Sequence, residues 1–270
     1  MLNTEKRNPN TMNIDKMSSA EMVRVIQAEN YNAVRAIDSE LDSIAAAIDA
    51  ISIRMEKGGR LFYIGCGTSG RLGVLDASEC PPTFGVSHDT VIGIMAGGDG
   101  ALRRAVENAE DNGEAGMRDI RAFDLTEKDS VVGISVAGGA AYVCGALEYA
   151  KSVGALTIAL TCNSGSKIEG IADISIHPDT GAEVITGSSR MKAGSSHKMI
   201  LNMISTSVMV KLGYVYENLM INLKPTNVKL EARMVRIVND IVGCGEQKAR
   251  ELLDETDWNI KNAIAKYSKN

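Results

Sequence analysis

The sequence lacks the features that mark several large classes of protein. Its five cysteines are an odd number and include no C-x-x-C pair, so no disulfide framework is indicated and we expect reduced thiols. Acidic residues (34) outnumber lysines and arginines (29), and the net charge of −5 argues against a nucleic-acid partner. No basic segment followed by an apolar run opens the chain, so no signal peptide is apparent. These absences predict a cytoplasmic location.

Long apolar runs are also scarce. Residues 130–147 contain no charged side chain over 18 residues, which is long enough to raise the question of a membrane span. Four glycines interrupt this stretch, and Ser130–Ser135 alone accounts for a strand. A strand, a glycine loop and a helix explain it better, so we expect no membrane partner.

The chain does contain a series of short apolar runs, which alternate with glycines and helical patterns. Together with 44% hydrophobic residues and 26 glycines, they predict an α/β domain whose parallel sheet is covered by helices on both faces. The expected strands are 61–64, 91–95, 130–135, 156–160 and 173–176. Ligands of such sheets bind beyond the carboxyl ends of the strands. We therefore expect one crevice surrounded by loops 65–70, 96–100 and 135–141.

Helical patterns flank the predicted sheet. After a polar arm, the capping box Ser18-x-x-Glu21 opens a helix toward Asn30, and a second helix with one apolar face ends at Gly58-Gly59. Beyond the sheet, residues 199–210 are apolar nearly all round and predict a buried helix. The chain is helical again from about residue 227, with a pair of helices at 246–255 and 258–267. The predicted division is an N-terminal arm with helices, a central domain and a C-terminal helical region, at 1–57, 58–225 and 226–270.

The most informative segment follows the first predicted strand. Gly65, Gly67 and Gly70 end the strand, a helix is predicted over Arg71–Ala77, and Pro81-Pro82 is expected to stop it. A strand that ends in glycines and hydroxyls before a helix N-terminus can cradle a phosphate or carboxylate. The spacing also matches the dinucleotide pattern G-x-G-x-x-G, but the next strand lacks the acidic residue that this pattern requires at its end. A compact phosphomonoester is the better fit.

The same segment resembles a known family. The run from Gly65 to Asp76-Ala-Ser-Glu-Cys-Pro-Pro82 is similar to the signature of N-acetylmuramic acid 6-phosphate etherases, which have the SIS (sugar isomerase) fold, and glucokinase regulatory protein shares parts of it. The likeness extends from Thr4-Glu5-x-Arg7-Asn8-Pro9 to the C-terminal helices, and residues 181–198 resemble the family's second signature. The resemblance implies a three-layer α/β sandwich with a five-stranded parallel sheet, residues 58–225 being the SIS domain, and a small C-terminal helical appendage. It also implies a homodimer with sites near the subunit interface.

The implied reaction releases D-lactate from N-acetylmuramic acid 6-phosphate and leaves N-acetylglucosamine 6-phosphate. A base removes the hydrogen on C2, an acid protonates the departing C3 ether oxygen, and water then adds at C3. Two carboxyl groups can supply this chemistry, and neither a metal nor an organic cofactor is needed. In the family these correspond to Glu79, as the acid, and Glu110, as the base. From the residues alone, both could equally be solvated surface carboxylates, and spacing does not select Glu110 over Glu107.

Further residues are candidates for binding the sugar phosphate. Arg71 could brace the first turn, and Glu183 could instead cap a loop. A lone histidine at the start of an apolar helix, His197, is expected to be structural, and His88 and His177 belong to no Cys/His cluster, so zinc is not expected. The candidate binding residues are Gly67, Thr68, Ser69, Gly70, Gly138, Gly139, Glu183, Ser188, Ser189 and Lys192.

One loop departs from the family pattern. After the third strand the family usually has Ser-Gly-Arg-Thr-Pro, whereas this chain has Ala137-Gly-Gly-Ala-Ala141. The backbone N–H groups remain, but two hydroxyls and a guanidinium are lost, and each lost hydrogen bond to a charged group costs about 1.5–3 kcal/mol. Three outcomes are open: the first turn compensates, the substrate differs, or the chain is a sugar-phosphate sensor without turnover. A sugar-phosphate isomerase is a further alternative.

Overall fold

The structure is a computed structural model that describes residues 2–225 and 227–268. Its contacts divide it into two compact units, Met1–Ser78 with Asp89–Val208 and Glu79–His88 with Met209–Asn270. The predicted N-terminal region begins at residue 1, and the predicted C-terminal region begins at residue 226 and ends at residue 270. These three residues lie outside the described residues. Each unit is described separately below.

The first unit is built on a five-stranded parallel sheet, which confirms the predicted fold class. The strand order is β2-β1-β3-β4-β5, and β1, β3 and β4 are buried along their whole length. Strands buried on both faces consist of near-continuous apolar residues, which is why short apolar runs located them in the sequence. The strands are β1 (Leu61–Gly65), β2 (Val91–Met95), β3 (Ser130–Ile134), β4 (Leu156–Leu160) and β5 (Ile174–Ile176).

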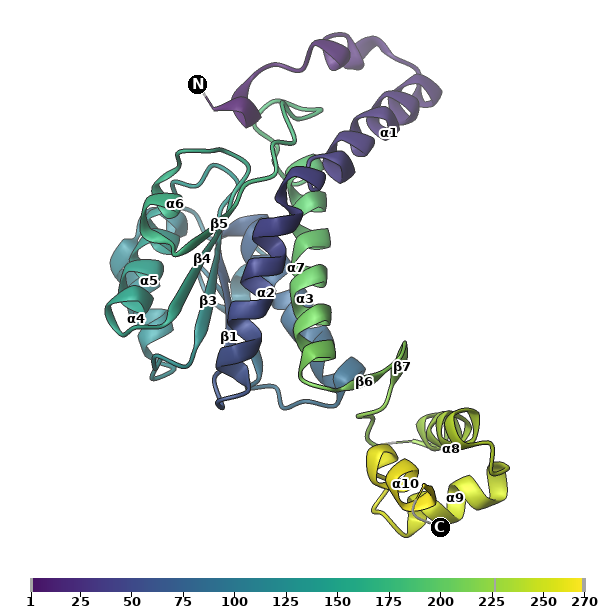
Figure 1. Cartoon of the computed structure of the whole chain (residues 1–270). Helices are drawn as coiled ribbons and strands as arrows, with labels where there is room; N and C mark the ends of the chain where they lie inside the picture. Colours follow the sequence, from purple (N-terminus) through teal and green to yellow (C-terminus); the bar gives the residue numbers. More distant parts are fainter. Residues whose placement is uncertain (1, 226, 269–270) are drawn as a thin grey trace. The chain divides into compact units, whose positions relative to one another are not determined.

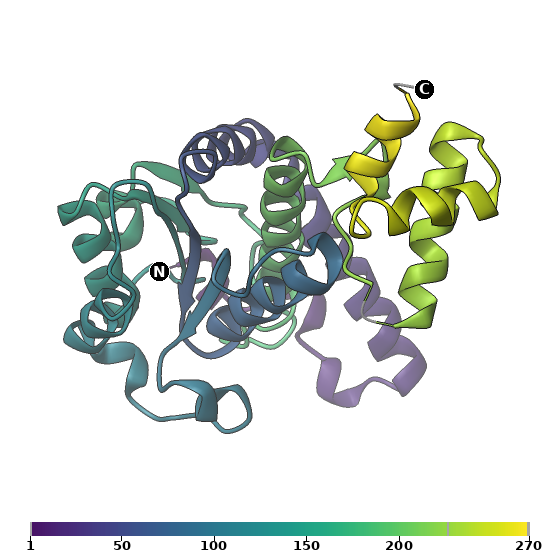
Figure 2. The same cartoon turned by 90° about the horizontal axis from the view of Figure 1, so that it is seen from below.

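Helices cover both faces of this sheet and complete three layers (Figures 1 and 2). One face carries α4 (Gly113–Arg121), α5 (Ala141–Ser152) and α6 (Lys167–Ile171). The other carries α2 (Leu41–Met55), α3 (Gly67–Phe84) and α7 (Lys192–Lys211). Side chains alternate between the layers, as the pleat of a strand requires. Phe62 and Ile64 belong to the cluster around α5, while Tyr63 faces Gly73 of α3.

The N-terminal segment begins with three short 3₁₀ helices, Asn3–Glu5, Pro9–Thr11 and Ile14–Lys16. The predicted capping box then opens α1 (Ser19–Arg35): the Ser18 N–H donates to Glu21 Oε2 at 2.8 Å, and the Glu21 N–H donates to Ser18 Oγ at 3.4 Å. The helix extends five residues beyond the expected end at Asn30. A short 3₁₀ helix, Asp38–Glu40, leads into α2.

The prediction for the helix after β1 was wrong at both ends. Helix α3 starts at Gly67, a single residue after the strand, and continues through Pro81 and Pro82 to Phe84. Proline removes a helical N–H, but the side chains around the two prolines, Cys80 and Phe84, are buried. Burial of this face outweighs local propensity, and the Gly85 N–H closes the last turn on the Pro81 carbonyl at 2.9 Å.

Helix α7 contains the apolar segment predicted to be buried. One face is fully buried through Ile200, Ile204 and Val208, but Met203 and Val210 are 38% and 46% exposed. The expectation of burial all round was therefore wrong for the opposite face. Within the described residues, no helix is long and apolar enough to cross a membrane.

The second unit is helical and has its own core. A two-stranded hairpin, β6 (Val215–Tyr216) and β7 (Leu219–Met220), precedes α8 (Val228–Val242), α9 (Glu246–Asp254) and α10 (Ile260–Tyr267). The predicted helices at the C-terminal end are confirmed. Gly243, with a φ of +66°, ends α8 in the left-handed conformation that glycine adopts readily. The shared core includes Met234, Val238, Leu252, Leu253 and Ala263.

Candidate active site

The sheet order defines where a ligand can bind. Strand β1 lies between β2 and β3. The chain therefore adds β2 on one side of β1 and then crosses to add β3, β4 and β5 on the other side. In open parallel sheets, ligands bind at such a reversal, beyond the carboxyl ends of the strands. The loops after β1, β2 and β3 therefore lie side by side, as expected from the sequence.

The segment after β1, residues 65–70, has the backbone arrangement that can cradle an anion at a helix N-terminus. Gly70 is the first residue of α3 whose N–H is bonded within the helix, to the Cys66 carbonyl at 3.2 Å. The N–H groups that precede it, including those of Thr68 and Ser69, have no intrahelical acceptor and lie at the positive end of the helix dipole. A Cβ on Gly70 would lie 2.5 Å from the Gly65 carbonyl oxygen. Only glycine therefore allows α3 to start directly on the end of β1.

The loop after β3 is shaped by Gly138. Its φ is +70°, and an added Cβ would lie 2.2 Å from the Ser166 Cβ, so the position requires glycine. The Gly138 N–H donates to the Ser135 carbonyl at 2.9 Å and to Ser135 Oγ at 3.1 Å. Gly139 is exposed, and Ala140, the N-cap of α5, has no side-chain acceptor. The first turn of α5 therefore presents backbone N–H groups without a capping hydroxyl.

A pocket of about 180 Å³ lies between the first loop and the segment after β2. It is lined by Cys66, Gly67, Glu107 and Glu110, among others. Both glutamates are exposed, so the pocket does not select one of them. Burial and the nearby carboxylates of Glu110 and Asp111 raise the pKa of the Cys66 thiol to about 12. Cys66 is therefore neutral at physiological pH and unsuited to act as a nucleophile.

Arg71 lies beside this pocket and acts as a brace. Its Nη2 donates to the Ala101 carbonyl at 2.7 Å, and its Nε donates to the Leu102 carbonyl at 3.0 Å. These bonds join α3 to the short 3₁₀ helix Asp99–Leu102. The guanidinium is thus bonded to backbone carbonyls of the protein, in agreement with the prediction that Arg71 braces the first turn.

Glu79 occupies a different part of α3. It is exposed, twelve residues after Gly67 on the same helix, and belongs to the second compact unit. Asp76, one turn earlier, is buried. Burial raises the pKa of the Asp76 carboxyl, while hydrogen bonds with Ser205 and Tyr63 oppose the increase. Sequence reasoning did not single out Asp76.

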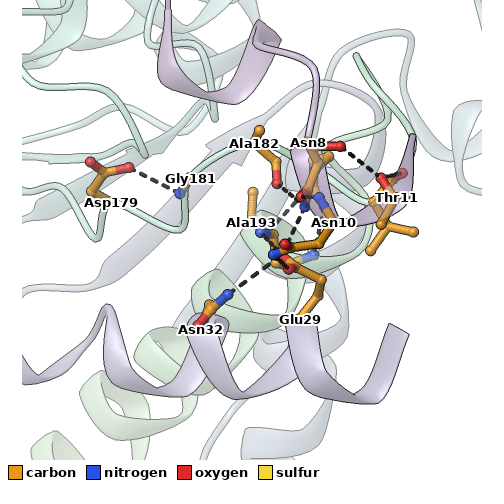
Figure 3. Close-up of polar contacts among 12 residues, drawn as sticks. Asn8, Asn10, Thr11, Glu29, Asn32, Asp179, Gly181, Ala182 and Ala193 are labelled. Carbon is orange, nitrogen blue, oxygen red and sulfur yellow. Dashed lines mark hydrogen bonds and ion pairs between the residues drawn. The ribbon is translucent and has the colours of Figure 1, made fainter. Parts of the chain in front are cut away.

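The predicted residues before and within α7 make contacts inside the chain. The carboxylate of Glu183 is fully buried and caps α7: Oε2 accepts from the Lys192 N–H at 3.1 Å and Oε1 from the Ala193 N–H at 3.0 Å. The Lys192 ammonium contacts Glu29 Oε2 at 2.5 Å, in the region shown in Figure 3. Sequence patterns gave no indication of Glu29. The predicted contacts of Glu183 and Lys192 with a substrate stay predictions.

The loop before α7 lies close to the first cradle. The Gly194 N–H donates to the Ser189 carbonyl at 3.0 Å, and a Cβ on Gly194 would lie 3.5 Å from Thr68 Cγ2. Ser188 and Ser189 are half-buried. Residues from both signature segments are therefore neighbours near the start of α3.

The histidines give no indication of a metal centre. His197 is fully buried with its Nε2 at 3.3 Å from Cys162 Sγ, and burial lowers the pKa of its imidazole to about 4. His177 lies with its Nδ1 at 3.1 Å from Glu169. No group of three histidine, cysteine, aspartate or glutamate side chains clusters as metal ligands in residues 2–225 and 227–268.

The fold and the cradle together define the SIS class of sugar-phosphate-binding proteins. Residues 104–209 match the SIS domain model, residues 43–151 match the N-terminal SIS domain of glucokinase regulatory protein, and residues 239–267 match a UBA-like domain. Among solved structures, a phosphoheptose isomerase from Francisella tularensis aligns with a TM-score of 0.56 at 20% identity, covering 72% of this chain and all of that one. The same enzyme from Neisseria gonorrhoeae aligns with a TM-score of 0.55 at 20% identity, covering 71% and 98%. At such identities these two structures support the fold alone.

Curated relatives identify the family. N-acetylmuramic acid 6-phosphate etherases from Caldanaerobacter subterraneus and Clostridium beijerinckii are 54% and 51% identical over 97% of this chain and 85% and 86% of their own lengths. The Salmonella agona enzyme is 49% identical over 97% of this chain and 88% of its own. The chain belongs to the N-acetylmuramic acid 6-phosphate etherase family. It is accordingly an enzyme, a carbon–oxygen lyase, and the resemblance seen in the sequence is confirmed.

Proposed function

We propose that the protein cleaves the D-lactyl ether of N-acetylmuramic acid 6-phosphate and forms N-acetylglucosamine 6-phosphate and D-lactate. The observation that carries this proposal is the identity of about half of all residues with etherases over nearly the whole chain. The reaction would serve the recycling of cell-wall sugars in the cytoplasm.

The phosphate is assigned to the two glycine loops. Gly67, Thr68 and Ser69 offer N–H groups at the start of α3, together with the two hydroxyls, and Gly70 allows the helix to begin close to β1. Before α5, Gly139 offers its backbone N–H, and Gly138 shapes the turn. Ser188 and Ser189 add polar groups from the loop near Thr68. Glu183 and Lys192 support this loop through their contacts at the start of α7. Anion binding at two helix N-termini is the physical basis of the assignment.

The chemistry is assigned to two carboxyl groups. In the open-chain sugar, the C1 aldehyde acidifies the C2 hydrogen, and the Glu110 carboxylate removes it. Protonated Glu79 donates its proton to the C3 oxygen as the C3–O bond breaks and lactate departs. The Glu79 carboxylate then takes a proton from water as the hydroxyl adds at C3 of the unsaturated intermediate. Glu110 returns its proton to C2, so that both groups regain their starting protonation states. Each carboxyl group is expected to contribute roughly 10²–10⁴-fold to the rate.

The exposure of Glu79 supports a homodimer whose sites are shared. Glu110 lines the pocket at the start of α3, and the Glu79 side chain is exposed and therefore accessible to a second chain. We assign the acid of each site to the partner subunit's α3. The exposed face of α7, with Met203 and Val210, provides apolar surface for dimer contacts.

Two variants test the chemical roles. Glu79→Gln should abolish lactate release but retain exchange of the C2 hydrogen with solvent deuterium, because only protonation of the leaving group is lost. Glu110→Gln should abolish both. Equal exchange in the two variants would refute the assigned roles, and sugar-phosphate binding by the unaltered protein without lactate release would instead indicate a sensor.

Mixing the same two variants tests the shared site. In heterodimers of Glu79→Gln with Glu110→Gln, one of the two sites would combine the two unaltered glutamates. Random mixing should therefore restore about a quarter of the activity of the unaltered protein. If both glutamates of a site come from one chain, every site in the mixture carries a substitution and no activity returns.

A further inference from the structure

The proposed chemistry leaves a buried network around Glu29 without a role. Glu29 lies on α1 and is 3% exposed, yet its carboxylate is ionised and fully bonded. Lys192 Nζ contacts Oε2 at 2.5 Å, Asn8 Nδ2 donates to Oε2 at 2.8 Å, and Asn10 Nδ2 donates to Oε1 at 2.8 Å. Figure 3 shows Asn8 and Asn10 of the N-terminal arm beside Glu29. Lys192 contacts the same carboxylate from the start of α7. An ion pair in this environment requires well-ordered partners.

The N-terminal arm is fastened at further points near the two substrate loops. Asn8 Nδ2 also donates to the Ala182 carbonyl at 3.1 Å, and Thr11 Oγ1 donates to the Val184 carbonyl at 2.8 Å. These bonds hold the segment on either side of Glu183, which caps α7. The arm is therefore tied to the loop that leads into α7.

The other end of the arm reaches the loop after β3. Asn163 Nδ2 donates to Thr4 Oγ1 at 3.1 Å and to the Val136 carbonyl at 2.8 Å. Val136 directly precedes Ala137, the first residue of the loop that departs from the family pattern. The arm thus contacts segments that adjoin both loops assigned to the phosphate.

The network has the properties of a support rather than of a second ligand site. A hollow of about 500 Å³ borders it, lined by Asn8, Asn10, Glu29 and Lys192 among others. The Lys192 ammonium is bonded to Glu29, and the Glu29 carboxylate also accepts from Asn8 and Asn10. A ligand in the hollow could engage the charges of Glu29 and Lys192 fully only by replacing these bonds. The contacts fix Lys192, which is the first residue of α7. The loop just before it contains Ser189, whose carbonyl accepts from the Gly194 N–H, and Gly194 lies close to Thr68.

We propose that Glu29 is a positioning residue for the sugar-phosphate site. By binding Lys192 and the arm together, it holds the loop 188–191 and the start of α7 against the cradle at Thr68. The inference rests on the proposed function in one respect, that the sugar phosphate binds at this cradle. Loss of the support should weaken binding of substrate and transition state alike, because the loop is displaced before any chemistry occurs.

Glu29→Gln is the primary test, since it keeps the size of the side chain and removes its charge. We expect KM for the 6-phosphorylated sugar to rise about tenfold with kcat within about twofold of the unaltered protein, which is the pattern of lost uniform binding. Asn10→Ala removes one donor to Glu29 at an exposed residue and should raise KM about threefold. This milder variant keeps the test open if Glu29→Gln does not fold.

Asp129→Asn provides the matched control. Asp129 is 1% exposed and paired with Arg60 at 2.9 Å, like Glu29 a buried acid in an ion pair, but it precedes β3 at the amino ends of the strands. It should lower the melting temperature and leave KM unchanged. An equal rise in KM for Asp129→Asn and Glu29→Gln, or a lower melting temperature of Glu29→Gln without a change in KM, would overturn the inference and leave Glu29 as an ordinary stabilising group.

The test separates this inference from the proposed function. Absence of lactate release by the unaltered protein would refute the etherase activity, and the comparison would then use the dissociation constant of N-acetylglucosamine 6-phosphate, measured by calorimetry. A Kd about tenfold higher for Glu29→Gln, with Asp129→Asn unchanged, supports the positioning role. Equal Kd values for Glu29→Gln and the unaltered protein refute it.

Discussion

The loop after β3 gives the sharpest test of how this protein holds a phosphate. Ala140 is the N-cap of α5, with extended backbone angles (φ −60°, ψ 117°), the conformation in which a serine or threonine hydroxyl caps a helix. The etherase pattern has threonine at this position and serine at Ala137. We expect Ala140→Thr to have two measurable effects, because one hydroxyl can accept a bond from a helix N–H and donate its own hydrogen to a phosphate oxygen.

The two effects have separate magnitudes. Capping of α5 should stabilise the fold by about 1 kcal/mol, which raises the melting temperature of a chain of this size by roughly 2–4 °C. Donation to a charged phosphate contributes about 1.5 kcal/mol, which corresponds to a roughly tenfold lower KM. Ala137→Ser lies outside the helix cap, so it should lower KM without stabilising α5.

Differential scanning calorimetry and steady-state lactate release measure the two effects independently. Ala140→Val is the matched control, since valine has the shape of threonine without the hydroxyl, and it should show neither effect. A higher melting temperature of Ala140→Thr with an unchanged KM would show that the hydroxyl caps α5 but meets no phosphate. The phosphate assignment to this loop would then be refuted.

Three further predictions concern stability. Gly138→Ala should destabilise the protein by about 1–3 kcal/mol, because the φ of +70° strains any side chain and the Cβ would meet Ser166, whereas Gly139→Ala, with open space around its Cβ, should change the urea midpoint little. Asp129→Ala should cost about 1–3 kcal/mol in urea unfolding, since the N–H groups of Arg60 and Thr126 would lose their acceptor; a loss well below about 1 kcal/mol would contradict this. Burial opposes ionisation of Glu29, but hydrogen bonds from Lys192, Asn10 and Asn8 lower its pKa from 4.5 to about 2. The resulting stabilisation, about 3 kcal/mol, is present above pH 4.5 and is lost as the pH falls toward 2. Unfolding free energies of Glu29→Gln should therefore fall less between pH 7 and pH 3 than those of the unaltered protein, and parallel pH curves would exclude this linkage.

The sequence determined the sheet and the identity of the family. Strands such as Leu61–Gly65 are buried on both faces, so their apolar residues are nearly continuous and visible without knowledge of the partners. The capping box of Ser18 and Glu21 is likewise a local pattern, because both bonds form within one turn. The glycines at 65–70 were likewise visible in the sequence, although α3 already begins at Gly67 within this segment. The similarity of the segment to etherases pointed to the reaction.

Tertiary structure decided two features that local sequence rules did not predict, the end of α3 and the partner of Glu29. Proline normally ends a helix, but α3 continues through Pro81 and Pro82 because Cys80 and Phe84 bury their side chains. The role of Glu29 could not be read from the sequence at all, since its partner Lys192 is 163 residues away. Periodicity indicates which face of a helix is buried. The partner of a buried charge, however, depends on how segments distant in the sequence pack together. Only the folded chain brings Glu29 and Lys192 into contact.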